Sequence, residues 1–485
     1  MNNDNHHPRK LTLSDLRNEI VGIDTCVPLL DGTERRYVFL DNAASTPTFR
    51  RVLKCVESFL PWYSGVHRGT GFKSVVATEA FDRAHEVVGT FVGADLATNH
   101  VIFTKNTTEC VNKLANRFMF NPDDIVVTTA MEHHSNLLPW RKYAQVIHVG
   151  ITNGGYLDFD ELNRTLVKYA GRVKLVAVSG ASNITGICSP IHAIAERAHA
   201  VGAKIFVDAA QLVPHRPVNM LPNDYPRHID FLAFSAHKMY APFGIGVLVG
   251  PHSFFAEGAP DMVGGGVVDV VTLDDVVWNE TRNKDEAGSP NVVGGVALAE
   301  AINMLQQVGM DAIAAHERHL IEYAFSRLKK LDGLRFYGPT VDVSEKVGVV
   351  PFTVDGMHHS LVSAILGAEA GIGVRNGYFC AQPYVKKLLN VSPEEEATGC
   401  GTSGDKTDVP GMVRASFGCY TNESDVDLFV EAMERIVRKE YKGAYVQDET
   451  TGSYYPQGMS VSLKKYFSFF DSVATPMERA YSEAS

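Results

Sequence analysis

Phe231-Leu232-Ala233-Phe234-Ser235-Ala236-His237-Lys238 is an apolar run that breaks into a polar turn and ends on a lysine. A second apolar run, Ile205-Phe206-Val207, ends in Asp208, and Gln211 follows one turn later. Short continuous apolar runs of this kind are consistent with strands buried in a parallel sheet. Because open α/β sheets bind ligands beyond the carboxyl ends of their strands, we expect Lys238 and Asp208 to face one crevice.

A lysine and a carboxylate at two strand ends suit one cofactor, pyridoxal 5′-phosphate (PLP). The aldehyde of PLP needs a lysine amine for its resting Schiff base, and its ring nitrogen needs a carboxylate that keeps it protonated. The alternative for any single lysine is a solvated surface residue. The combination of Lys238 with Asp208 favours the cofactor site.

Along the chain, apolar strand-like runs alternate with helical patterns. This alternation predicts an α/β fold in which helices wrap a mainly parallel sheet. Helices are expected at 109–120, 191–201 and 293–308. The sheet is expected to contain seven strands, at 101–104, 125–129, 145–149, 174–179, 204–207, 231–234 and 246–249.

A different pattern begins after about residue 314 and predicts a smaller α+β domain. A long charged helix comes first, and a β-rich stretch (347–354) and helices at 360–370 and 425–439 follow. We therefore divide the chain into an N-terminal arm (1–37), a large domain (38–314), a small C-terminal domain (315–440) and a C-terminal extension (441–485).

The segment 390–411 is rich in Gly, Ser, Thr and Pro and is expected to be a loop inserted in the small domain. It carries the acidic run 394–396 and Cys400. Long loops in compact domains are often lids or docking surfaces, and a tolerated surface insertion is the alternative.

Composition is typical of a soluble cytoplasmic enzyme. The chain has 485 residues, of which 45% are hydrophobic, so it can bury a large core. A formal charge of −11 and the lack of a basic run disfavour nucleic acid and anionic membranes as partners. The seven cysteines form no CxxC pair, which argues against a disulfide scaffold or a structural zinc site. The N-terminus lacks the apolar core of a signal peptide.

Three further loops follow predicted strands and carry polar side chains. Asn106-Thr107-Thr108 opens a helix and could hold a phosphate there, or be an ordinary N-cap. In the stretch 131–136 an imidazole could stack on a flat ring. The adjacent pair His133 and His134 could instead indicate a metal site. No HxxxH or HxxEH pattern accompanies the pair, which makes the metal the weaker interpretation. Asn183, in the stretch 182–186, offers an amide to the cofactor. The glycine runs match no nucleotide-binding motif.

These motifs together resemble the class V PLP-dependent enzymes, and within them the cysteine desulfurase/selenocysteine lyase family. The resemblance covers roughly residues 38–438 and implies the PLP-dependent transferase fold type I. The motifs that carry it are Asp41-Asn42-Ala43-Ala44, Thr107-Thr108-Glu109, Glu132-His133-His134, Asp208-Ala209-Ala210-Gln211, Ser235-Ala236-His237-Lys238, Ala287-Gly288-Ser289-Pro290-Asn291, Arg375-Asn376-Gly377-Tyr378-Phe379-Cys380-Ala381 and Arg414-Ala415-Ser416.

The resemblance implies a role for each residue around the cofactor ring. Lys238 would be the Schiff-base lysine, and Asp208 would pair with the ring nitrogen. His133 would stack on the ring, while Gln211 and Asn183 would address its phenolic oxygen.

The resemblance also implies the phosphate, substrate and sulfur sites. Thr107, Thr108, Ser235 and His237 would hold the phosphate, and Ser289 would complete that cup from the other subunit of a homodimer. Arg414 would bind the substrate carboxylate in bidentate fashion, with Arg375 as a second cation and Asn183 beside it. Cys380 would take sulfur from L-cysteine, giving alanine and an enzyme persulfide that a sulfur-acceptor protein could discharge.

The chain departs from the family pattern beside Cys380. Tyr378-Phe379 replaces the usual pair of histidines, and Asn376 replaces a threonine, so the preference for sulfur or selenium stays open. The alternative for Cys380 is a small buried hydrophobe. Alternative activities are a C–S lyase, an epimerase or an aminotransferase acting on another amino acid, and the non-enzyme alternative is a sulfur-transfer scaffold.

Overall fold

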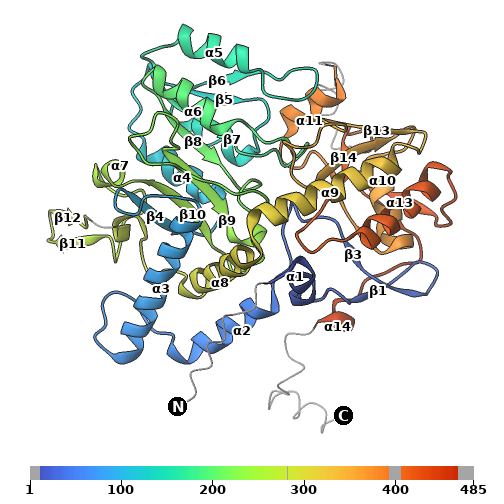
Figure 1. The fold of residues 1–485 in the computed structure, drawn as a ribbon, viewed down its shortest axis with the longest axis horizontal. Coiled ribbons are helices and arrows are strands. Elements are labelled where there is room, and N and C mark those ends of the chain that lie inside the picture. The colour runs from blue at the N-terminus through green and yellow to red at the C-terminus, as the bar shows by residue number, and fades with distance from the viewer. Residues whose placement is uncertain (1–10, 281, 393–405, 468–485) are drawn as a thin grey trace.

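The computed structural model describes residues 11–280, 282–392 and 406–467. Its largest sheet has seven strands in the order β4-β10-β9-β8-β7-β5-β6 (Figure 1). β10 pairs antiparallel with β4 and β9, and the other neighbouring strands pair in parallel. The predicted sheet is confirmed, and its strands are β4 (Asn99–Thr104), β5 (Ile125–Thr129), β6 (Gln145–Val149), β7 (Val173–Ser179), β8 (Lys204–Asp208), β9 (Phe231–Ser235) and β10 (Gly246–Pro251).

Alternate side chains of these strands bury both faces of the sheet, as continuous apolar runs require. Leu232 and Phe234 of β9 point into one core and Phe231 and Ala233 into another. The first core lies under α3 (Phe72–Phe91), α5 (Phe159–Lys168), α6 (Ile191–Ala200) and α8 (Val292–Val308), with α2 (Arg50–Phe59) beside α8. The second lies under α4 (Thr107–Arg117) and α7 (His252–Ala256).

The smaller domain has an antiparallel sheet in the order β13-β14-β17-β16. Its core also contains Val38 and Leu40, because β3 (Val38–Phe39) pairs in parallel with β15 (Ile372–Gly373). The predicted α+β character is confirmed. The strands are β13 (Leu334–Phe336), β14 (Val349–Val354), β16 (Arg375–Gly377) and β17 (Met412–Ser416), and the helices are α9 (Met310–Leu328), α10 (His359–Ala370), α11 (Gln382–Leu389) and α13 (Glu423–Val437).

Both ends of the described chain pack on this smaller domain. The N-terminal arm forms α1 (Leu13–Glu19) and a hairpin of β1 (Cys26–Pro28) and β2 (Glu34–Arg36), and the Leu30 N–H bonds the Ala368 carbonyl at 2.8 Å. The C-terminal extension forms a hairpin of β18 (Tyr445–Gln447) and β19 (Tyr454–Pro456) followed by α14 (Leu463–Tyr466).

The C-terminal hairpin contacts both the last, described part of the inserted loop (406–411) and α10. Gln447 Nε2 donates to the Thr407 carbonyl at 2.8 Å, and the Tyr454 N–H donates to Ser360 Oγ on α10 at 2.9 Å. The acidic run 394–396 and Cys400 lie outside the described residues.

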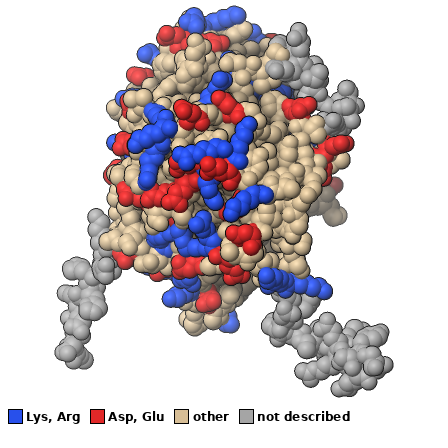
Figure 2. Space-filling view, turned by 90° about the vertical axis from the view of Figure 1, so that its right-hand side faces the viewer, with Lys and Arg blue, Asp and Glu red and all other residues tan. Residues whose placement is uncertain are grey.

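The face of the smaller domain in Figure 2 carries basic and acidic side chains interspersed, without one dominant sign. Six cysteines fall within the described ranges, and each is a free thiol. Among the described helices, none combines the length and the apolar character needed to cross a bilayer.

Candidate active site

The carboxyl edge of the large sheet opens into a cavity of about 330 Å³. The loops after β4, β5 and β7 and the ends of β8 and β9 all reach it, because these strands run in one direction. The small domain closes it from the other side through β16, β17 and the loop after β16. The predicted site residues that line the cavity are Thr107, Thr108, His133, Asn183, Asp208, Gln211, Ser235, His237, Lys238, Arg375, Cys380 and Arg414.

Lys238 lies in a 3₁₀ turn directly after β9. Its side chain opens onto the cavity, yet desolvation lowers its pKa to about 8, while Asp208 acts in the opposite direction. Asp208 ends β8 and is buried, which raises its pKa; a hydrogen bond from the Ala210 N–H (3.1 Å) and the charge of Lys238 act against this. A lysine with this pKa is partly unprotonated near neutrality and can act as a nucleophile.

Hydroxyl groups gather at the start of α4. Ser235 Oγ accepts from the Thr107 N–H at 2.8 Å and lies 2.6 Å from Thr107 Oγ1. Thr108 Oγ1 lies 2.7 Å from Ser135 Oγ. Asn106 caps the helix by accepting from the Glu109 N–H at 3.0 Å. Asn106 therefore acts as the N-cap that the sequence allowed. The threonines line the cavity, and their role in holding a phosphate stays a prediction.

The turn after β5 sends successive side chains to different parts of the site. His133 lines the cavity, and desolvation together with nearby Lys238 lowers its pKa to about 3, so its ring is neutral. His133 Nδ1 accepts from the Ser135 N–H at 3.1 Å. Buried Glu132 supports the turn through Asn136 Nδ2 (2.6 Å) and the hydroxyl of Ser179 (2.7 Å). Burial raises the pKa of Glu132 to about 7.

Asp41 joins the two arginines of the site. Its carboxylate accepts from Arg414 at 3.0 Å and lies 3.0 Å from Arg375. Arg414 is buried on β17 and also donates to the Asn183 carbonyl at 2.9 Å. The sequence identified the motif that contains Asp41 but predicted no role for this residue, because pairing between residues 41 and 414 depends on the tertiary fold.

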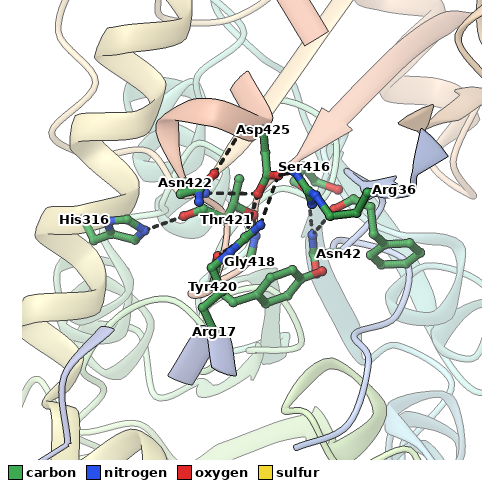
Figure 3. A network of polar contacts seen from close by, with 11 residues as sticks. Arg17, Arg36, Asn42, His316, Ser416, Gly418, Tyr420, Thr421, Asn422 and Asp425 are labelled. Carbon is green, nitrogen blue, oxygen red and sulfur yellow. Dashed lines mark hydrogen bonds and ion pairs between the residues drawn. The ribbon is translucent and has the colours of Figure 1, made fainter. Parts of the chain in front are cut away.

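A polar network holds the segments of Asp41 and Arg414 together (Figure 3). Asn42 Nδ2 donates to the Ser416 carbonyl at 2.9 Å, and Tyr420 donates to Asn42 Oδ1 at 2.9 Å. Arg17 and Arg36 of the N-terminal arm both pair with Asp425 at 2.7 Å. The arm thus holds the first turn of α13, the helix that follows β17 and Arg414 in the chain.

Cys380 lies on the exposed side of the cavity, in the loop between β16 and α11. Phe379 and Cys380 have φ angles of 50° and 57°, in the left-handed region that non-glycine residues rarely adopt. The Phe379 ring faces the Arg414 guanidinium, whose Cζ lies 4.8 Å from the centroid of the ring. The Phe379 carbonyl accepts from Asn183 Nδ2 at 2.8 Å. The residue that replaces a family histidine therefore contacts the predicted substrate-binding arginine.

The cavity residues fit PLP. Of the side chains that line the cavity, Gln211 Oε1 and Arg414 Nε are buried without a hydrogen-bond partner, so polar groups of a bound molecule can satisfy them. A nucleophilic lysine, a buried carboxylate, a neutral imidazole and a hydroxyl cluster supply what the amine linkage, ring nitrogen, ring face and phosphate of PLP require.

Ser289 does not line this cavity. It borders a separate hollow of about 830 Å³ together with the loop of Ser64–Gly69 and with Gly265 and Gly266. Its predicted role from a second subunit stays a prediction.

One group of potential metal ligands occurs among the described residues: His199, His228 and Asp230. His228 and Asp230 directly precede β9, so the group lies at the amino end of that strand, whereas Lys238 follows its carboxyl end. The Asp230 carboxylate already pairs with Lys204 Nζ at 3.0 Å and accepts from the Ile205 N–H at 2.9 Å. Its charge is therefore matched by a lysine.

Comparison with known proteins points to one family. A profile of the aminotransferase class-V family matches residues 38–429. A probable cysteine desulfurase of Halobacterium salinarum is 38% identical over 82% of this chain and 91% of its own length. A cysteine desulfurase of Haloferax volcanii is 36% identical over 82% and 88%.

Solved structures agree with this result. The apo cysteine desulfurase of Thermococcus onnurineus superposes with a TM-score of 0.74 at 33% identity, over 83% of this chain and 95% of that one. A cysteine desulfurase of Escherichia coli gives a TM-score of 0.73 at 29% identity, over 89% and 100%. The fold is PLP-dependent fold type I, as the sequence predicted, and the chain belongs to the aminotransferase class-V family, among its cysteine desulfurases.

Proposed function

We propose that this protein is a PLP-dependent cysteine desulfurase that converts L-cysteine to L-alanine and leaves the sulfur on Cys380 as a persulfide. The observation that carries the proposal is the shared cavity: Lys238, Arg414 and Cys380 all line it. A lysine that can hold a cofactor, a cation for a carboxylate and an exposed thiol are the groups this reaction needs. The names of the relatives support the same activity.

Arg414 and Lys238 prepare the substrate. Arg414 has an unpartnered Nε and would bind the substrate carboxylate, with Arg375 as a second cation at the exposed rim. When bound, PLP supplies an electron sink that makes the α-proton of the amino acid acidic. Lys238 Nζ, with a pKa of about 8, can remove that proton and return it at neutral pH.

Cys380 takes the sulfur. Its thiolate Sγ attacks the substrate sulfur, so a new S–S bond forms while the substrate Cβ–S bond breaks. The electron pair of the broken bond stays on the carbon side, and a proton converts that carbon to the methyl group of alanine. The enzyme retains Cys380 with one additional sulfur, and no external oxidant or reductant takes part.

The exposure of Cys380 supports release of the sulfur to a second molecule, either a small thiol or a sulfur-acceptor protein. The unpaired cysteines of the described chain support a reducing compartment such as the cytoplasm. Selenocysteine offers the equivalent Cβ–Se bond for cleavage. Phe379 beside Cys380 provides no proton donor that would favour sulfur or selenium.

The enzyme would act as a homodimer. Ser289 faces a hollow of about 830 Å³, separate from the cavity of Lys238. Exposed apolar side chains lie close in sequence to other residues that line this hollow. Phe72 is at the start of α3, and Val271 and Leu273 belong to the hairpin of β11 (Val268–Val271) and β12 (Val276–Trp278). Such exposure is typical of a subunit interface. Analytical ultracentrifugation should give twice the mass of the 53.1 kDa chain.

The decisive experiment measures products. PLP-loaded protein is incubated with L-cysteine, L-selenocysteine and a panel of other amino acids, and alanine, sulfide, pyruvate and keto acids are assayed together. We expect alanine and sulfide from L-cysteine with a reducing thiol present, and neither with Cys380→Ala. Alanine release that survives Cys380→Ala would contradict the persulfide route, and pyruvate or keto acids as the main product would favour a lyase or an aminotransferase.

A further inference from the structure

The loop of Cys380 is held in a conformation that its own sequence does not favour. Two successive non-glycine residues, Phe379 and Cys380, adopt left-handed φ angles of 50° and 57°. Residues with a Cβ atom are disfavoured in that region relative to right-handed backbone. Such a conformation persists only where neighbouring groups hold it.

His134 contacts this loop at two points. Its backbone N–H donates to the carbonyl of Cys380 at 2.7 Å. Its ring Nε2 accepts from the backbone N–H of Gln382 at 3.2 Å. The two bonds lie on either side of Ala381, so the residue that follows Cys380 is bracketed by one histidine.

The bond to Gln382 has a second use. Gln382 is the first residue of α11, where backbone N–H groups have no partner within the helix. Nε2 can accept this N–H only when the ring is neutral, with its hydrogen on Nδ1. Desolvation and the nearby charge of Arg141 lower the pKa of His134, which favours the neutral ring.

The turn that carries His134 is itself held in place by the central sheet. His134 follows His133 in the turn that Glu132 supports from the sheet. His133 lines the cavity proposed for the cofactor, and His134 contacts the Cys380 loop. The cofactor cavity and the Cys380 loop are therefore both positioned by the turn after β5.

We propose that His134 is a positioning residue that docks the Cys380 loop against the cavity through its backbone N–H and its ring Nε2. This rests on the proposed function only in giving the docked loop a purpose, which is to hold Sγ within reach of the substrate sulfur. A displacement of about 1 Å at a reacting group can cost about 100-fold in rate. Loss of the ring acceptor should therefore reduce kcat more than it changes KM.

Three variants separate this role from general stability. His134→Leu removes the acceptor, and His134→Asn keeps a polar side chain that is too short to reach Gln382. His134→Gln keeps an acceptor oxygen at comparable reach. His192→Ala is the control, since His192 is also part-buried and its ring bonds the backbone, at the Arg227 carbonyl (2.8 Å), away from the Cys380 loop.

Each variant is loaded with PLP and measured in three ways: visible absorption, kcat and KM for L-cysteine with a reducing thiol, and the rate of Cys380 alkylation by iodoacetamide. We expect normal absorption in all variants, and a fall in kcat of about 10-fold or more in the Leu and Asn variants with KM nearly unchanged. Alkylation should become several-fold faster in both, because the loop is released. His134→Gln should restore most of both values.

Wild-type rates in His134→Leu and His134→Asn, or a Gln variant as impaired as Leu, would overturn the proposal. Alkylation needs no turnover, so it still tests the docking if the wild type makes no alanine from L-cysteine. That latter result would remove the proposed function alone. If His134→Leu does not fold, the pair of His134→Asn and His134→Gln gives the same comparison.

Discussion

The two halves of the cavity are built in different ways. Lys238, Asp208 and Ser235 lie on or directly beside neighbouring strands of a buried sheet, so regular hydrogen bonding fixes their separation. Cys380 lies in a loop whose conformation depends on contacts from Asn183 and His134. The half that would hold the cofactor is therefore fixed by regular secondary structure. The half with Cys380, which we propose takes the sulfur, is held by a few hydrogen bonds to a loop.

This difference suits the proposed chemistry. An electron sink works best when its partners stay in place through the whole reaction, since preorganised charges need no rearrangement. A sulfur carrier must approach the substrate and then meet an acceptor. Changes in the rigid half should therefore stop turnover, whereas changes in the loop half should alter it by degrees.

The largest effect is expected from Lys238→Ala. Removal of the amine takes away both the covalent link to PLP and the base, so turnover should fall about 10³-fold or more. Borohydride reduction followed by peptide mass spectrometry should find pyridoxyl on Lys238 in the wild type. Lys346 is an internal control, because it is also buried with a pKa lowered to about 7 but bonds the Thr185 carbonyl outside the cavity. Pyridoxyl found on Lys346 would show that Lys238 is not the residue that binds PLP.

Asp208→Asn tests the same half more gently. The amide cannot hold a proton on the ring nitrogen, and two pKa units of lost stabilisation, at about 1.4 kcal/mol each, correspond to about 100-fold in rate. Cofactor absorption should remain, since the lysine and the hydroxyl cluster are intact. Steady-state alanine production measures the loss, and near-normal turnover would show that Asp208 is not the ring partner.

The regular part of the molecule was the part that sequence could predict. Each of the seven expected strands was found, and Lys238, Asp208 and the threonines after β4 followed from their strands. Asp41, Glu132 and the contacts of Phe379 were not predicted, because their roles depend on partners far away in the chain. No periodic pattern indicates that residue 379 adopts a left-handed φ or that its ring meets residue 414.

Cofactor uptake should depend on pH through the protonation of Lys238. Desolvation lowers the pKa of Lys238 to about 8, so below that pH most of the amine is protonated and cannot attack the PLP aldehyde. The rate of apoprotein reconstitution should rise about tenfold per pH unit as pH approaches 8 from below and level off above it. Stopped-flow absorption between pH 6.5 and 9.5 measures this. A rise that continues toward pH 10 would indicate an ordinary exposed lysine, and Lys238→Ala is the blank.

The smallest effect is expected from Phe379→Leu, which tests the loop half. The ring of Phe379 lies 4.8 Å from the Arg414 guanidinium, and such a contact contributes about 0.5–2 kcal/mol depending on desolvation. Leucine keeps the bulk but not the π face, so Arg414 should be held less firmly and KM for L-cysteine should rise about 5-fold, with kcat little changed. Phe379→Tyr retains the π face and should preserve KM. Tyr378→Ala is the matched control, because the neighbouring ring faces Lys386 on α11 at 5.8 Å instead. Equal KM values in the Leu and Tyr variants would show that the ring only fills space, and that Asp41 and the Asn183 carbonyl suffice to position Arg414.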